Sequence, residues 1–192
     1  MKSILDIYFH VKNMLENNPE LQQAMYHGWM HTKTFFDAVC YLAPLEDIDD
    51  RSILTLKIGA LYHDTGYLSG ESYNHEYRSA VIAHKDLQSF GMPEGDIDQI
   101  CRLILSTMLS FRPIGILEEI MHDADLEYLG RDYYPYVAEL LRKESNIDCA
   151  IWKVEQISFM KRHQFITSSA RKIFDRQKAA NLRILEENED TE

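Results

Sequence analysis

The sequence predicts an all-α protein. Apolar residues recur at positions i, i+3, i+4 and i+7 along almost all of the 192 residues, which is the pattern of amphipathic helices. No segment alternates with a period of two between Asn-Gly or Asp-Gly turns, so no strand or hairpin is predicted. Proline and glycine breaks divide the pattern into about eight or nine helices. We therefore expect a single helical domain over residues 1–192.

Each helix is marked by its own apolar stripe. The first two stripes lie within residues 4–15 and 35–43, and a third run, 53–62, stops abruptly at the polar pair His63–Asp64. A fourth helix opens at His75, the cleanest stripe covers 97–109, and the next, 117–129, carries Asp125 on its apolar face. Further helices are expected within 149–187, followed by a frayed, solvated acidic tail, 186–192.

Composition and charge narrow the class of protein. An apolar share of 45% and a charged share of 27% are typical of a soluble globular protein. The net charge of −11 argues against duplex nucleic acid as a partner, because binding its phosphate backbone needs a basic surface. The negative net charge does not argue against a small phosphorylated substrate, which needs only local positive charge or a metal. The sequence shows no signal peptide and no membrane-spanning run, and its three isolated cysteines are typical of reduced thiols, so we expect a cytoplasmic protein without a membrane partner.

Histidines and aspartates form the most informative set. His27 and His31 lie four apart, so on one helix they would share a face. His63 and Asp64 stand at a helix end, where neighbouring side chains can reach one point. Asp125 faces a core, which is costly unless the carboxylate is paired or binds a metal. Each residue alone is more often structural, but together they offer the mixed nitrogen and oxygen ligands that suit Mn, Fe, Co, Ni or Zn.

The order His31 … His63-Asp64 … Asp125 resembles the signature of the HD-domain superfamily of metal-dependent phosphohydrolases. The similarity runs from about residue 26 to residue 142, through the segments YHGWMHT, LYHDTGY, NHEYRSA and DADLEYLGR. The resemblance implies a helical bundle of the HD-domain type that holds a metal between helices. The helices of 149–187 would pack on this motif core.

The resemblance also implies a metal centre and a reaction. His31, His63, Asp64 and Asp125 become the ligands of one divalent transition metal, with Asp64 also counted among the catalytic residues. The implied activity is hydrolysis, by metal-activated water, of a phosphate ester of a nucleotide or related small molecule. The sequence leaves open whether that ester is a phosphomonoester, a cyclic phosphodiester or a pyrophosphate.

Two further histidines take roles from the same resemblance. His27 resembles the histidine that protonates the leaving oxygen in cyclic nucleotide phosphodiesterases, although Gly28 stands where those enzymes carry Asn. His75 matches a ligand of a second metal in binuclear members. The next binuclear position falls near Ser106–Thr107, where the chain has no His. A second ion would therefore bind more weakly, and di-iron oxygenase chemistry is disfavoured.

Other assignments stay open between two interpretations. Glu76 is either a partner of the second metal or of a ligand histidine, or an acid placed at a helix N-terminus by the dipole. Arg78 either binds phosphate or lies on the surface. The whole chain is alternatively a metal-containing nucleotide-binding regulatory module with little turnover, or a plain helical interaction protein. The C-terminal helices either shape the pocket or form a homodimer face.

Overall fold

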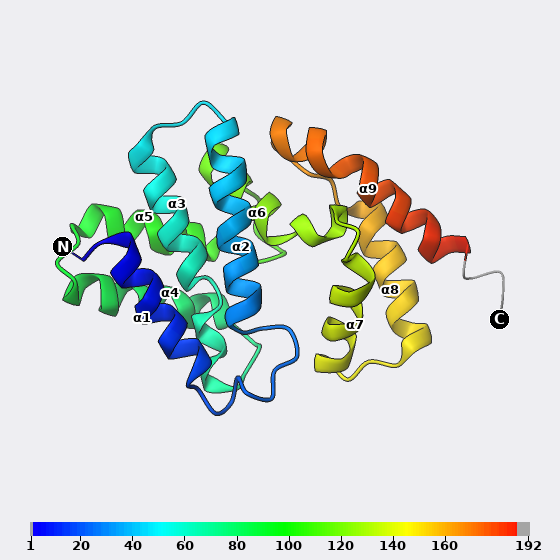
Figure 1. Ribbon diagram of the computed structural model, residues 1–192, viewed down its shortest axis with the longest axis horizontal. Helices are drawn as coiled ribbons and strands as arrows, with labels where there is room; N and C mark the ends of the chain where they lie inside the picture. Colours follow the sequence, from blue (N-terminus) through cyan, green and yellow to red (C-terminus); the bar gives the residue numbers. More distant parts are fainter. Residues whose placement is uncertain (1, 188–192) are drawn as a thin grey trace.

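The computed structural model describes residues 2–187, and this part of the chain contains nine α-helices, three 3₁₀ turns and no strand (Figure 1). The all-α prediction and the predicted number of helices are confirmed. The helices are α1 (Ile4–Glu16), α2 (Trp29–Leu42), α3 (Asp50–Tyr62), α4 (His75–Ser89), α5 (Glu94–Leu105), α6 (Ile116–Asp125), α7 (Tyr134–Glu144), α8 (Cys149–Arg162) and α9 (Ser168–Glu187). The 3₁₀ turns are η1 (Ala43–Leu45), η2 (Thr65–Ser69) and η3 (Glu127–Gly130).

Short polar residues fix where several helices begin. Ser3 starts α1 with a capping box, in which its hydroxyl accepts from the Asp6 backbone and the Asp6 carboxylate accepts in return. Asp49 caps α3, and Asp148 caps α8 through the N–H groups of the first turn. These caps satisfy backbone donors that have no partner inside the helix.

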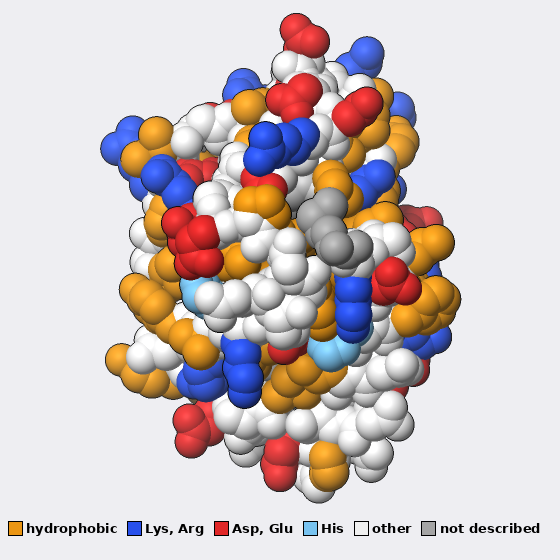
Figure 2. All heavy atoms as spheres, turned by 90° about the vertical axis from the view of Figure 1, so that its left-hand side faces the viewer, with side chains coloured by type: hydrophobic (Ala, Val, Ile, Leu, Met, Phe, Trp, Pro, Cys, Tyr) orange, Lys and Arg blue, Asp and Glu red, His pale blue; other side chains and the backbone are white. Residues whose placement is uncertain are grey.

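Helix α3 lies at the centre of the first half of the molecule. Its last two turns are buried on all sides, because α2 and α5 pack against it and α1 covers it further (Figure 1). The helices α7, α8 and α9 lie together on the right-hand side of Figure 1. On the face drawn in Figure 2, acidic and basic side chains are interspersed. No helix within residues 2–187 combines the length and apolar character needed to cross a membrane.

The turn after α3 is tightly packed against the start of α4. The helix ends at Tyr62, so His63 and Asp64 stand at a buried helix end, as predicted. The Gly66 amide donates to the Ser79 hydroxyl at 2.7 Å. A Cβ atom added at Gly66 would lie 2.0 Å from the His75 carbonyl oxygen, so only glycine allows this approach. The close contact holds the two motif segments together.

Helix α9 is attached to α6 by a buried carboxylate. Asp123 is fully buried and accepts hydrogen bonds from the backbone of Ile166 and Thr167 and from the Thr167 hydroxyl, at 2.7 to 3.1 Å. Asp123 therefore fixes the chain just before α9. The expected acidic tail, 186–192, begins later than predicted, because α9 continues to Glu187. Residues 188–192 lie outside the described part of the chain.

Candidate metal centre and cleft

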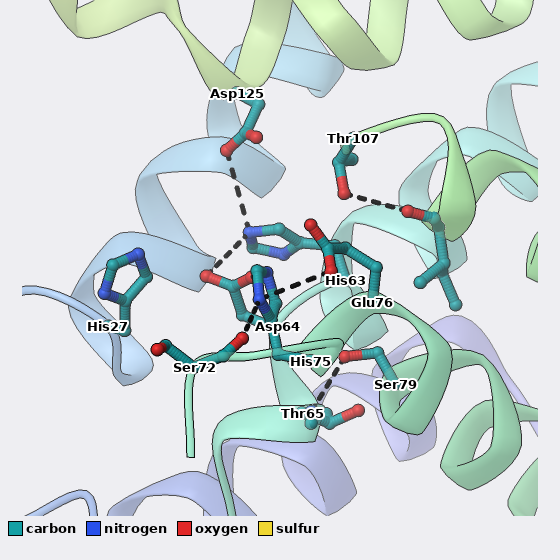
Figure 3. Close-up of polar contacts among 12 residues, drawn as sticks. His27, His63, Asp64, Thr65, Ser72, His75, Glu76, Ser79, Thr107 and Asp125 are labelled. Atoms are coloured by element: carbon teal, nitrogen blue, oxygen red, sulfur yellow. Dashed lines mark hydrogen bonds and ion pairs between the residues drawn. The ribbon is translucent and has the colours of Figure 1, made fainter. Parts of the chain in front are cut away.

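The four predicted ligands converge from three helix ends, and Figure 3 labels His63, Asp64 and Asp125 among them. His31 Nε2 lies 3.3 Å from a carboxylate oxygen of Asp64 and 3.3 Å from one of Asp125. His63 Nε2 lies 3.1 Å from Asp64 and 3.8 Å from Asp125. His31, His63 and Asp64 are almost completely buried, whereas the Asp125 side chain is 19% exposed. The centre is therefore enclosed on one side and open at Asp125.

Hydrogen bonding leaves one carboxylate oxygen inside this cluster unsatisfied. His63 Nδ1 donates to the Ala60 carbonyl at 3.0 Å, which leaves the other ring nitrogen, Nε2, facing the cluster. That Nε2 lies only 3.0 Å from Nε2 of His31. The Asp64 Oδ2 atom is buried and accepts no hydrogen bond from residues 2–187. Several ligand atoms thus face the same point.

A divalent metal fits this arrangement. Two ligand atoms about 2.1 Å from one ion and at right angles to each other lie about 3 Å apart, close to the spacing found here. His31, His63 and Asp125 each offer an atom within 4.8 Å of the others. The donor set of imidazole nitrogens and carboxylate oxygens suits the transition metals predicted from the sequence. The four side chains would hold such an ion.

The charges around His31 show what a metal would have to displace. Burial opposes protonation of its ring, but Asp125 and Asp64 outweigh that effect and raise the pKa of His31 to about 10. Burial alone would raise the pKa of Asp64, but the neighbouring histidines outweigh burial and hold that pKa well below its usual range. A proton on His31 therefore balances the carboxylates of this cluster, and a cation can replace it.

His75 and Glu76 lie beside the same carboxylate. His75 Nδ1 donates to the Ser72 carbonyl at 2.9 Å, which leaves Nε2 directed at the second oxygen of Asp64, 3.3 Å away (Figure 3). Asp64 thus lies between His75 on one side and His31 with His63 on the other. Glu76 Oε2 is 3.4 Å from His75 Nδ1 and lines the cleft. This arrangement fits the predicted weaker second metal position.

His27 does not share a helix face with His31, contrary to the expectation from their spacing, because α2 begins only at Trp29. The His27 ring instead stacks on Tyr67, with centroids 4.2 Å apart and planes 15° from parallel. Its Nδ1 pairs with a carboxylate oxygen of Glu144 on α7. Its Nε2 has no partner within residues 2–187 and is not enclosed. The ring is therefore fixed with one nitrogen free.

Glu144 is a site residue that the sequence does not reveal. Its second oxygen accepts the backbone N–H groups of Tyr26, at 2.7 Å, and His27, at 3.1 Å. Burial alone would raise the pKa of Glu144, but the His27 ring and these N–H groups outweigh it and hold the pKa at about 2. No motif marks Glu144, which ends an otherwise ordinary amphipathic helix.

Arg78 braces a loop beside the site. Its guanidinium donates to the carbonyls of Gly66, at 3.0 Å, and Tyr73, at 2.5 Å, and also to that of Glu71. Arg78 does not line the cleft. Arg78 thus has a structural role, because it holds the segment between η2 and α4 in place.

A cleft of about 1000 Å³ opens over the cluster. His27, His31, Asp64 and Asp125 line one side, and one face of α8 lines the other. Among the described residues that line it, Arg162 is the one Lys or Arg side chain, and its guanidinium donates to the Ser158 hydroxyl, with no carboxylate partner within residues 2–187. Of the two roles predicted for the C-terminal helices, shaping the pocket is the one that α8 fulfils.

Two tyrosines of the motif segments also lie in this cleft. Tyr26 and Tyr67 line it, while Trp29 is part of the core and Tyr73 is 81% exposed. The residues of α8 were missed because their spacing resembles that of any half-buried helix. Arg171, another arginine of the C-terminal helices, donates to the Ile166 carbonyl and does not line the cleft.

Comparison with known proteins shows the fold. No protein-family model and no curated protein sequence matches the chain. The Lin1889 protein from Listeria innocua has a similar structure, with a TM-score of 0.69 and 18% identity over 98% of this chain and 96% of its own. YpgQ from Bacillus subtilis, crystallised in complex with ADP, has a TM-score of 0.68 and 16% identity over 98% of this chain and 97% of its own.

Proposed function

We propose that this protein is a metal-dependent phosphohydrolase of the HD-domain type, acting on a phosphate ester of a nucleotide. The observation that carries the proposal is the convergence of His31, His63, Asp64 and Asp125, with the Nε2 atoms of both histidines facing a buried carboxylate oxygen that accepts no hydrogen bond. A divalent metal bound there would lower the pKa of a coordinated water and polarise a phosphoryl oxygen.

His27 supplies the acid of this reaction. When the bond between phosphorus and the leaving oxygen breaks, that oxygen needs a proton. Glu144 holds the ring through Nδ1, so Nε2 is the atom left to give the proton on the cleft side. Stacking on Tyr67 restricts the ring further. This positioning favours an enzyme over a module that only binds its ligand.

A nucleotide suits the cleft in size and charge. The cleft volume of about 1000 Å³ is at the upper end of the range for small-molecule sites. Arg162 offers a guanidinium without a carboxylate partner in a protein of net charge −11, and such a group attracts phosphate. The ADP complex of the structurally similar YpgQ supports a nucleotide ligand.

The test begins with the metal content of the purified protein. Elemental analysis is expected to find about one transition-metal ion per chain in the wild type and in Asp132→Asn, an exposed control, but not in Asp64→Asn. Hydrolysis is then measured with Mn, Co, Ni, Mg and Zn, by phosphate release from AMP and ADP and by the formation of AMP from cyclic AMP. Hydrolysis should need both the metal and Asp64. Nucleotide binding without turnover would favour the regulatory module instead.

A further inference from the structure

Gln156 is a buried amide that lines the cleft opposite the metal centre. Its side chain belongs to α8 and only 7% of the residue is exposed. The hydroxyl of Tyr134, itself 1% exposed, donates to Gln156 Oε1 at 3.2 Å. A rigid core residue thus fixes which way the amide points.

The other end of this amide is free. Gln156 Nε2 has no acceptor within residues 2–187, yet it is not among the enclosed polar atoms that lack a partner. It is therefore open to the cleft that the residue lines. Because an amide donor held in this way has lost its freedom to rotate, a ligand acceptor can use it at a small entropic cost.

Aromatic rings flank the amide on the same helix face. Trp152 lies one turn before Gln156 and Phe159 lies one turn after it, and both line the cleft. A planar ring can stack on such side chains. The wall of α8 thus combines apolar rings with one oriented donor, which suits a planar heteroaromatic group that carries an acceptor.

Charge separates this wall from the phosphate end of the site. Glu155 lines the cleft beside Gln156 and would repel a phosphate. The groups that attract phosphate are the metal cluster, on the other side of the cleft, and Arg162 at the C-terminal end of α8, six residues from Gln156. A nucleotide whose phosphate reaches the metal cluster can therefore turn its base toward α8.

We infer that Gln156 is a specificity-determining residue, which donates through Nε2 to an acceptor on the nucleobase, with Tyr134 as the positioning residue for its amide. This inference rests on the proposed function, because it names the part of a nucleotide that α8 contacts. A base with a ring nitrogen or carbonyl oxygen in reach is accepted, and one that offers a donor there is disfavoured.

The experiment compares the diphosphates of adenosine, guanosine, cytidine and uridine with the metal-loaded protein. Equilibrium dissociation constants and KM are measured for the wild type, Gln156→Leu, Gln156→Glu and Tyr134→Phe, with Gln88→Leu on the exposed face of α4 as the matched control. Thermal unfolding shows that each variant is folded. The wild type and Gln88→Leu should prefer one base over the poorest by about tenfold or more.

Gln156→Leu should reduce that preference to about twofold, and Tyr134→Phe should weaken it, because the amide is then free to rotate. Gln156→Glu replaces the donor by an acceptor, so the order of preference should change. An unchanged order in all three variants, or a wild type that binds every base equally, overturns the inference. Because binding is measured apart from turnover, base preference without hydrolysis would contradict the proposed function alone.

Discussion

Glu144 pairs with the imidazole of His27 across 117 residues of sequence, and it also accepts the backbone N–H groups of Tyr26 and His27. One carboxylate thus fixes both the ring and the backbone that carries it. The segment before α2, which has no helix of its own, is ordered by α7 in this way. The metal cluster makes no use of Glu144, so its contribution can be separated from metal binding.

Replacing Glu144 is therefore expected to impair turnover and to spare the metal. In Glu144→Gln the amide still fills the space but no longer carries the charge that pairs with the ring, so kcat should fall about 10- to 100-fold. Steady-state kinetics and elemental analysis measure the two effects. Glu139→Gln, which removes an exposed partner of Arg142, is the control. If Glu144→Gln lost its metal, the separate roles assigned here would be wrong.

Asp123 should control the stability of the fold and Asp125 the binding of the metal, although only one residue stands between them. Asp123→Asn weakens the buried hydrogen bonds to Ile166 and Thr167, and we expect it to lower the free energy of unfolding by about 2 kcal/mol. Its metal content should stay at the wild-type level. Urea denaturation measures the first quantity and elemental analysis the second.

The matched variant Asp125→Asn is expected to show the opposite pattern. It lies at the open edge of the cluster, so the metal-free protein should lose only the pairing with His31, and less stability than Asp123→Asn, while metal affinity falls. Equal losses of stability and metal in both variants would count against this division between a structural and a ligand carboxylate.

Gly66→Ala should disturb the metal centre from outside it. The new methyl group would meet the His75 carbonyl oxygen at 2.0 Å, so the segment that carries Asp64 must move away from α4. We expect a loss of stability of about 2–3 kcal/mol and weaker metal binding. Gly28→Ala is the control, because nothing lies within 4 Å of a Cβ atom there and its extended backbone suits any residue. A wild-type melting temperature for Gly66→Ala would refute the packing argument.

His163 should make the fold sensitive to acid. Its ring is buried, and burial, together with Lys178 and His122 and against the opposing effect of Asp123, lowers the pKa of His163 to about 3. The unfolded chain then takes up this proton first, so stability is complete above pH 6.5 and is lost as the pH falls toward 3. Between pH 7 and pH 5 this one group should cost about 2 kcal/mol.

Urea denaturation of the wild type and His163→Leu at pH 7, 6 and 5 measures that loss. The variant lacks the titrating ring, so its stability should fall less steeply by about that amount. His84→Leu, which removes a half-buried histidine paired with Glu94, serves as the control and should follow the wild type. Parallel curves for His163→Leu and the wild type would show that the buried ring does not govern the acid response.

The sequence by itself determined the helices and the order of the ligand residues. Helix periodicity and caps depend on residues a few positions apart. The apolar stripes of 53–62 and 117–129 therefore predict α3 and α6 without knowledge of any tertiary contact. His63 and Asp64 are recognisable for the same reason, because a polar pair interrupts an apolar run. The predicted ligands His31, His63, Asp64 and Asp125 do lie together in the structure.

Only the tertiary structure decided what surrounds these ligands. Glu144 and Gln156 each sit on a helix whose sequence is ordinary, and they gain their roles from partners 117 and 22 residues away. Arg78 stands within a motif, yet its guanidinium is taken up by nearby carbonyls. The sequence determines which side-chain groups are present, but the packing of the helices determines which of them share a cleft.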